Sequence, residues 1–184
     1  MINLRGHSGG AIGSDHQWEA IGREIIKDPN TLNFIHYYHG ARTPYGNRPV
    51  TEEEYAKGVA AVHRANKTLN RRVNYYMSLL ARNYLPVKEA TAVFAIVASA
   101  SERIIDGGTA WGLQMAADEG KPRYIFDQGV NLWKEWESGW GWCKCECPIL
   151  TTEFAAIGTR QINDRGKAAI AEIYRKTLRK WGLK

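Results

Sequence analysis

Two glycine-rich segments of the sequence have the composition of anion-binding turns. The first runs from Arg5 to Asp15 (Arg-Gly-His-Ser-Gly-Gly-Ala-Ile-Gly-Ser-Asp), and the second, Asp-Gly-Gly-Thr-Ala, covers residues 106–110. Each follows a strand-like run and precedes a helix-like run. Glycine lets the backbone approach a ligand closely, and N–H groups at a helix start attract anions. Two such turns side by side would therefore bind a phosphorylated small molecule.

The first segment differs from the fingerprint of dinucleotide-binding proteins. From Ser8 to Gly13 its order is Ser-Gly-Gly-x-x-Gly instead of G-x-G-x-x-G. The second expected strand ends in His39, Gly40 and Arg42, where an NAD site has an acidic residue for the ribose hydroxyls. NAD-linked hydride transfer is therefore disfavoured, and no cofactor is expected.

Residues 39–49 form a loop with two prolines and two glycines at the carboxyl end of an expected strand. Ligands of parallel sheets bind at these ends, so the loop has the profile of a functional lid. Tyr45 and Arg48 could close over a ligand there, and His39 and Arg42 of the same loop are also candidate ligand-binding residues.

Further side chains could reach the same crevice. Trp111 comes directly after the second glycine turn, and its ring could stack on a base or belong to the core at a helix start. Arg82 and Asn83 precede Pro86 and could also reach the ligand. A cation at a helix C-terminus is the simpler account of Arg82.

The elements that position these residues alternate between strand and helix. Capping boxes at 14–17 (Ser-Asp-His-Gln) and 51–54 (Thr-Glu-Glu-Glu) predict two helix starts, and Asn163 or Asp164 would cap the last helix. A helix is also expected over 74–85, and 127–141 is expected to be irregular. Strands are expected at 2–7, 33–39, 92–98, 123–127, 142–150 and 154–158. This alternation predicts one α/β domain with a mostly parallel sheet and helices on both faces.

Composition and charge narrow the class of protein. The chain has 184 residues, 44% of them hydrophobic, but no apolar run long enough to span a membrane and no signal-peptide stretch at its start. We expect a cytoplasmic protein with no membrane partner. The net charge of +6 lies in residues 160–184, where eight basic residues oppose two acidic ones. That segment is either a solvated helix face or a patch that contacts phosphate or nucleic acid, but binding of nucleic acid is disfavoured because the remainder is neutral.

The three cysteines do not suggest a metal site. Cys143, Cys145 and Cys147 alternate, so they would lie on one side of an edge strand. An odd number argues against a disulfide framework, and a structural zinc site usually has four ligands. We expect no metal.

The combination of Ser-Gly-Gly-Ala-x-Gly-x-Asp at 8–15 with Gly-Gly-Thr-x₆-Ala at 107–116 resembles the SLOG superfamily of Rossmann-like proteins. That group includes Lonely-Guy-type nucleotide phosphoribohydrolases, molybdenum-cofactor carriers, DNA-processing proteins and sensor domains for NAD-derived signals. The resemblance implies a single nucleotide-binding domain over 1–184 with a Rossmann-like three-layer fold. Residues 154–160 are similar to a Gly-Ile-Gly-Ser-Arg turn near the start of some members, which implies a rearranged or extended strand order. The general plan also resembles that of bacteriophage proteins.

The resemblance implies roles for particular residues. Asp15 would orient the first turn or bind a hydroxyl, although a plain carboxylate in a first helical turn is an equal alternative. Arg160 would neutralise a phosphate with a two-pronged contact, or form a surface salt bridge. The residues expected to hold phosphate or ribose come from the two turns: Ser8, Gly9, Gly10, Gly13, Gly107, Gly108 and Thr109.

One position departs from the phosphoribohydrolase motif Pro-Gly-Gly-x-Gly-Thr-x-x-Glu. Gln114 stands where that family has the glutamate required to cleave the base–sugar bond. Catalysis would need another carboxylate in the crevice, and the candidates are Asp15, Glu102 and Asp106.

These observations favour a binding protein over an enzyme. The first expectation is capture of a nucleotide or NAD-derived small molecule without turnover. A phage protein of this kind would sequester a cyclic ADP-ribose-type or cyclic-nucleotide immune signal in the host cytoplasm. The alternative is a nucleotide N-glycoside hydrolase or transferase. A homo-oligomer, dimer or higher, is expected because superfamily relatives are often dimers and seven tryptophans leave apolar surface for an interface.

Overall fold

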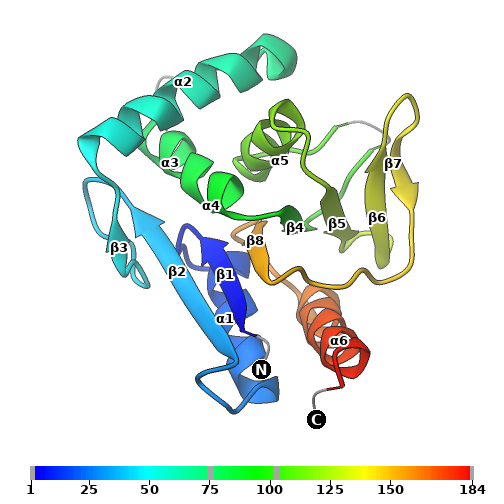
Figure 1. Cartoon of the computed structure of the whole chain (residues 1–184). Coiled ribbons are helices and arrows are strands. Elements are labelled where there is room, and N and C mark those ends of the chain that lie inside the picture. The colour runs from blue at the N-terminus through cyan, green and yellow to red at the C-terminus, as the bar shows by residue number, and fades with distance from the viewer. Residues whose placement is uncertain (1–2, 74–76, 102–103, 183–184) are drawn as a thin grey trace.

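In the computed structural model of the chain, residues 3–73, 77–101 and 104–182 are described. Within them, one sheet has the strand order β3-β2-β1-β8-β4-β5-β6-β7 (Figure 1). Pairing is parallel from β3 to β5, and β6 and β7 add antiparallel strands at one edge. The strands are β1 (Leu4–Ser8), β2 (Leu32–Tyr38), β3 (Arg48–Pro49), β4 (Ala92–Val97), β5 (Arg123–Asp127), β6 (Leu132–Glu137), β7 (Gly141–Lys144) and β8 (Glu153–Gly158).

Helices cover both faces of this sheet (Figure 1). On one face α1 (Ser14–Ile25) and α6 (Asp164–Lys180) pack on the sheet through Trp18 and Tyr174. The other face is covered by α2 (Glu52–Leu69), α3 (Met77–Arg82), α4 (Tyr84–Glu89) and α5 (Thr109–Asp118). The prediction of a Rossmann-like α/β fold with a mostly parallel sheet and three layers is therefore confirmed.

The central strand β4 shows why the sequence folds in this way. All six of its residues are buried, because alternate side chains enter the two cores. Phe94 and Ile96 pack on the α1–α6 side, whereas Val93 and Ala95 pack on the α5 side. A continuous apolar run is what a strand covered on both faces requires. In the described residues, no helix has the length and apolar composition that a membrane crossing needs.

Two of the three helix N-caps predicted from the sequence are found in the structure. The capping box at Thr51 is present, with the Glu54 N–H donating to Thr51 Oγ1 at 3.2 Å, and Asn163 caps α6 by accepting the N–H of Gly166 at 3.1 Å. The capping box expected at Ser14 is wrong. The N-cap is Gly13, and the Ser14 hydroxyl instead donates to Thr159 O at 2.7 Å, because α1 begins close against the end of β8.

Two other local predictions are wrong. Residues 127–141 are not irregular, since they contain β6, which pairs with β7 around packed tryptophans. The edge strand expected over 142–150 ends at Lys144, so Cys143 alone of the three cysteines lies in it. For the helix expected over 74–85, residues 74–76 lie outside the described residues. Pro86 does not end a helix but lies in the first turn of α4, where its missing N–H has no helical acceptor to lose.

Candidate functional site

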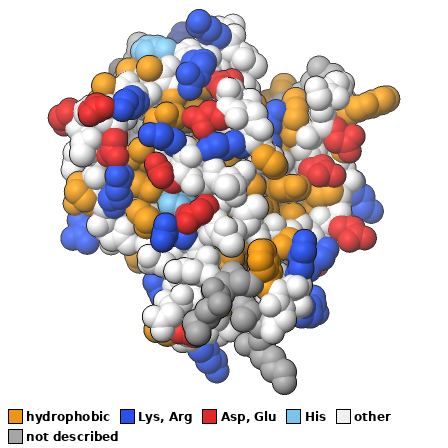
Figure 2. All heavy atoms as spheres, viewed as in Figure 1, with side chains coloured by type: hydrophobic (Ala, Val, Ile, Leu, Met, Phe, Trp, Pro, Cys, Tyr) orange, Lys and Arg blue, Asp and Glu red, His pale blue; other side chains and the backbone are white. Residues whose placement is uncertain are grey.

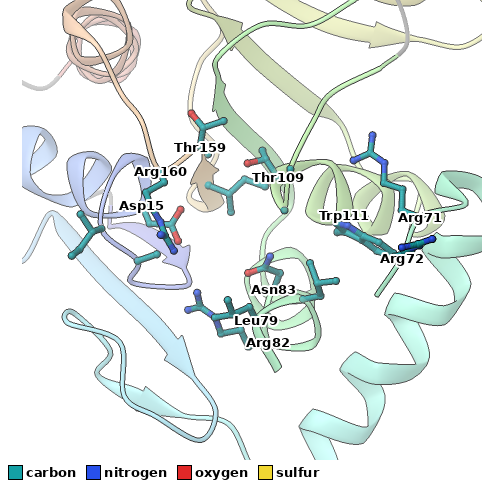
Figure 3. A pocket seen from close by; sticks show the side chains of 17 residues that line it. Asp15, Arg71, Arg72, Leu79, Arg82, Asn83, Thr109, Trp111, Thr159 and Arg160 are labelled. Carbon is teal, nitrogen blue, oxygen red and sulfur yellow. The ribbon is translucent and has the colours of Figure 1, made fainter. Parts of the chain in front are cut away.

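A cavity of about 580 Å³ opens at the carboxyl ends of the central strands (Figure 3). Both glycine-rich segments line it, the first through Ala11, Ile12 and Asp15 and the second through residues 107–109. The turn after β8 adds residues 157–160. Segments about a hundred residues apart in the chain thus meet at one edge of the sheet, where parallel α/β folds bind their ligands.

Two helices begin at this cavity without a side-chain cap. In the part of the chain that the structure describes, neither α1, with Gly13 at its N-cap, nor α5, with Gly108, receives a capping hydrogen bond from a side chain. The first N–H group of α1, that of Ser14, donates to Thr159 O at 3.2 Å. Uncapped N–H groups and the helix dipole give each start a partial positive charge. The start of α5 therefore favours an anion in the cavity, whereas the first turn of α1 already contains the carboxylate of Asp15.

Neither the backbone conformation nor the described surroundings of Gly108 require a glycine at this position. Its φ of −66° suits any residue, and a Cβ built there would meet no described atom within 4 Å. Gly13 differs, because its φ is 109° and a Cβ would overlap the carbonyl of Arg160. At Gly108 the free space is the cavity, and the missing side chain leaves the backbone open to a ligand.

The lining carries a clear excess of positive charge. Figure 3 shows Arg82 and Arg160 near Asp15 on one side, and Arg71 and Arg72 on the other. Among the described residues that line the cavity, Asp15 is the one carboxylate. Four guanidinium groups against one carboxylate make the cavity attractive to anions.

Arg82 is the most buried of these cations, with 5% of its surface exposed. Its Nη1 donates to the carbonyls of Gly9 and Tyr37, the second at 3.0 Å, but no described group accepts from Nε. Burial lowers the pKa of Arg82 below its usual range, and the nearby Asp15 charge opposes this. The guanidinium also explains Gly9, because a Cβ there would overlap it.

The buried carboxylate of Asp15 accepts hydrogen bonds from the backbone of the first glycine turn. Its Oδ2 accepts the N–H of Gly9 at 3.1 Å, and the N–H of Ala11 also bonds to the carboxylate. Burial raises the pKa of Asp15 above its ordinary value, while the charge of Arg82 and these N–H groups act in the opposite direction. The N–H of Gly10 is taken by Ser8 Oγ at 3.1 Å. Ser8, Gly9 and Gly10 are thus buried beside the cavity and do not line it.

A chain of hydrogen bonds that the sequence did not reveal begins at Ser8. The Ser8 hydroxyl lies 2.6 Å from His36 Nδ1, and His36 Nε2 lies 2.7 Å from Glu19 Oε2. The strand register puts Ser8 opposite His36, and Ser8 stands in a Gly6-x-Ser-x-Gly10 pattern. The order serine, histidine, acid is that of a catalytic triad. However, Ser8 is fully buried outside the cavity lining, so this chain fixes the turn and does not present a nucleophile.

The residues of the expected lid lie outside the cavity lining and are held by the protein itself. Tyr45 stacks on the ring of His16 at 3.8 Å, and Arg48 forms an ion pair with Glu54 at 2.6 Å. His39 stacks on Tyr55, also at 3.8 Å between ring centroids, and Arg42 donates to Gly46 O at 2.6 Å. In this structure the loop packs on its neighbours without closing over the cavity.

Of the remaining residues singled out in the sequence, Trp111 lines the cavity, whereas Asp106 and Gln114 do not. Trp111 lines the cavity but is 4% exposed and belongs to the core, so both sequence-based interpretations describe part of its position. Asp106 is exposed outside the lining, and Glu102 lies outside the described residues. Gln114 faces a second cavity and donates to Asp118 at 2.8 Å.

Four lining residues between the end of α2 and the start of α4 extend the site. Arg82 and Asn83 line the cavity, in agreement with the expectation that they could reach it. Arg71 and Arg72 were missed by sequence reasoning, although two adjacent arginines directly after the left-handed C-cap Asn70 were a usable signal. Among the described residues, no group of three or more potential metal ligands is found.

A comparison with protein-family models, with curated proteins and with solved structures finds no significant match.

Proposed function

We propose that the protein binds a phosphorylated nucleotide or an NAD-derived small molecule in the cavity at the carboxyl ends of β1, β4 and β8. The observation that carries this proposal is the convergence of four arginines and the start of α5, which has no side-chain cap, on a space with one described carboxylate. Phosphate oxygens match such donors better than any neutral ligand does.

The arginines of the lining divide into two kinds. Arg82 is buried and fixed, with an unpartnered Nε, so a bound anion would offset an existing desolvation cost. Arg72 and Arg160 are exposed and long, so they can close on a phosphate from the rim. Because the amides of the first turn are already taken by Asp15 and Ser8, the start of α5 is the main backbone contact for the ligand.

Binding without turnover is favoured over catalysis. Gln114 cannot act as a carboxylate, and Asp106 stands outside the lining. A protein with this site would act as a sponge for a nucleotide signal, such as one of the cyclic ADP-ribose or cyclic-nucleotide type.

A nucleotide N-glycoside hydrolase or transferase is the second candidate, and one observation favours it. Asp15 is a buried carboxyl group at the cavity, and burial raises its pKa toward the range of a general acid. Its hydrogen bonds to the turn amides oppose this role, because they fix the carboxylate away from a substrate.

The two candidates are separated by recovering the ligand. The purified protein is incubated with AMP, ADP-ribose and cyclic ADP-ribose, heated to unfold it, and the released compounds are identified by mass spectrometry. A sponge returns each ligand unchanged. An altered ligand whose appearance is abolished in Asp15→Asn would establish the hydrolase, and the absence of any bound ligand would refute both candidates.

A further inference from the structure

A second cavity, of about 700 Å³, lies next to the first. Arg71 lines both cavities, whereas Arg72 lines the first and Ile105 the second. The Nη2 group of Arg71 donates to the carbonyl of Ile105 at 2.7 Å. One arginine therefore stands at the partition between the two spaces.

Besides Arg71, the second cavity has a cation from β5, Arg123. Its guanidinium is stacked over Trp136 at 4.4 Å and lies 5.8 Å from the ring of Trp142. Nη1 donates to Leu113 O at 3.2 Å, and no carboxylate of the described residues lies within ion-pair distance. Burial lowers the pKa of Arg123 to about 10, against the weaker effect of the Asp118 charge. The remaining donors of this flat group are thus available in a half-buried place.

The wall of the second cavity contains two aromatic side chains. The rings of Trp136 and Trp142 meet at 78° with their centroids 5.3 Å apart, and Gln114 adds an amide from α5. Figure 2 shows hydrophobic side chains gathered on the side of the molecule where Figure 1 shows β6 and β7. Aromatic walls with hydrogen-bonding groups are the usual means of holding a nucleobase.

We propose that the second cavity is the base subsite of a nucleotide whose phosphate occupies the first cavity, an inference that rests on the function proposed above. The five donors of Arg123 form a planar fork that matches two neighbouring acceptors. Guanine and hypoxanthine present such a pair, a carbonyl oxygen beside a ring nitrogen, whereas adenine presents an amino donor at the first position. The ligand class is therefore a 6-oxopurine nucleotide.

The test compares GMP, AMP and ribose 5-phosphate by isothermal titration calorimetry on the wild type and on Arg123→Lys. This variant keeps the charge but loses the fork. GMP should bind about tenfold more tightly than AMP to the wild type, and Arg123→Lys should lose most of that preference. Binding of ribose 5-phosphate, which lacks a base, should be the same in both. Arg175→Lys, an exposed change on α6, is the control and should alter nothing.

A second variant covers the case in which Arg123→Lys unfolds. Arg123→Met keeps an unbranched side chain beside Trp136 but removes all the donors of the fork, so it should also remove the preference for GMP. If both variants fold and keep the wild-type preference, or if the wild type binds GMP and AMP equally, the base subsite is refuted while phosphate binding stands. If neither GMP nor ribose 5-phosphate binds the wild type, the proposed function itself fails.

Discussion

The carboxylate of Asp15 accepts the N–H of Gly9 at 3.1 Å, so a side chain of α1 holds the turn that precedes this helix. A negative oxygen of the protein thus occupies the place that an anion would take in a phosphate-binding turn. The first glycine turn is therefore a structural support for the cavity, and the arginines with the start of α5 are left to contact the ligand.

Removal of this carboxylate should destabilise the fold. In Asp15→Ala, the N–H groups of Gly9 and Ala11 lose their acceptor in a buried turn, and we expect a loss of about 1–3 kcal/mol in the free energy of unfolding. Urea denaturation followed by circular dichroism measures this loss. Glu24→Gln, an exposed change on the same helix, is the matched control. Equal stability of Asp15→Ala and the control would show that the turn does not depend on Asp15.

The stability that Glu19 contributes should depend on pH. Hydrogen bonds from His36 and Arg23 lower the pKa of Glu19 below its ordinary value of 4.5, against the effect of burial. A lowered folded-state pKa means that the contribution is fully present above the ordinary value and is lost as pH falls through the lowered one. Glu19→Gln should therefore cost about 1 kcal/mol at neutral pH and progressively less below about pH 4.

Urea denaturation of the wild type and Glu19→Gln across this pH range tests the prediction. Glu24→Gln again provides the control, because Glu24 is exposed. A difference between wild type and Glu19→Gln that stays constant over the range would contradict the assigned hydrogen bonds.

Substitution of Gly108 should affect ligand binding without lowering the stability of the fold. An added Cβ meets no described atom within 4 Å and the backbone conformation suits alanine, so Gly108→Ala should keep or slightly raise stability. The methyl group would enter the cavity, and we expect nucleotide affinity to fall by about tenfold. Thermal unfolding and calorimetric titration of the same sample measure both properties. A stable variant with wild-type affinity would exclude the start of α5 from the ligand site.

The sequence was sufficient for the fold because its strongest patterns are local. The apolar run of β4 and the capping box at Thr51 specify their elements without reference to the rest of the chain. The hairpin of β6 and β7 was missed because its stability comes from tryptophans that pack across strands. The start of α1 was misassigned because the bond from Ser14 to Thr159 joins residues that only the folded sheet brings together.

For the site, the sequence predicted the edge of the sheet at which the cavity lies, but it did not predict the side-chain contacts around it. It brought residues 107–109 and the end of β8 to one cavity, since the carboxyl ends of parallel strands share an edge. It could not show that Tyr45 stacks on His16 of α1, or that Arg48 pairs with Glu54 six residues later, because both contacts depend on the path of the loop. Arg71 was missed because its position depends on the path of the chain after α2.

The rim arginines provide the most direct test of phosphate binding. Arg72→Ala, Arg160→Ala, the double variant and Arg175→Ala are titrated with AMP, GMP and ADP-ribose in a calorimeter at low and moderate salt. Each rim substitution should weaken binding by about tenfold and the double variant by about a hundredfold, with a smaller loss at moderate salt because charges at the rim are screened. Arg175→Ala should bind as the wild type does. Wild-type affinity in the double variant, or no binding by the wild type, would contradict the assignment of this cavity to a phosphorylated ligand.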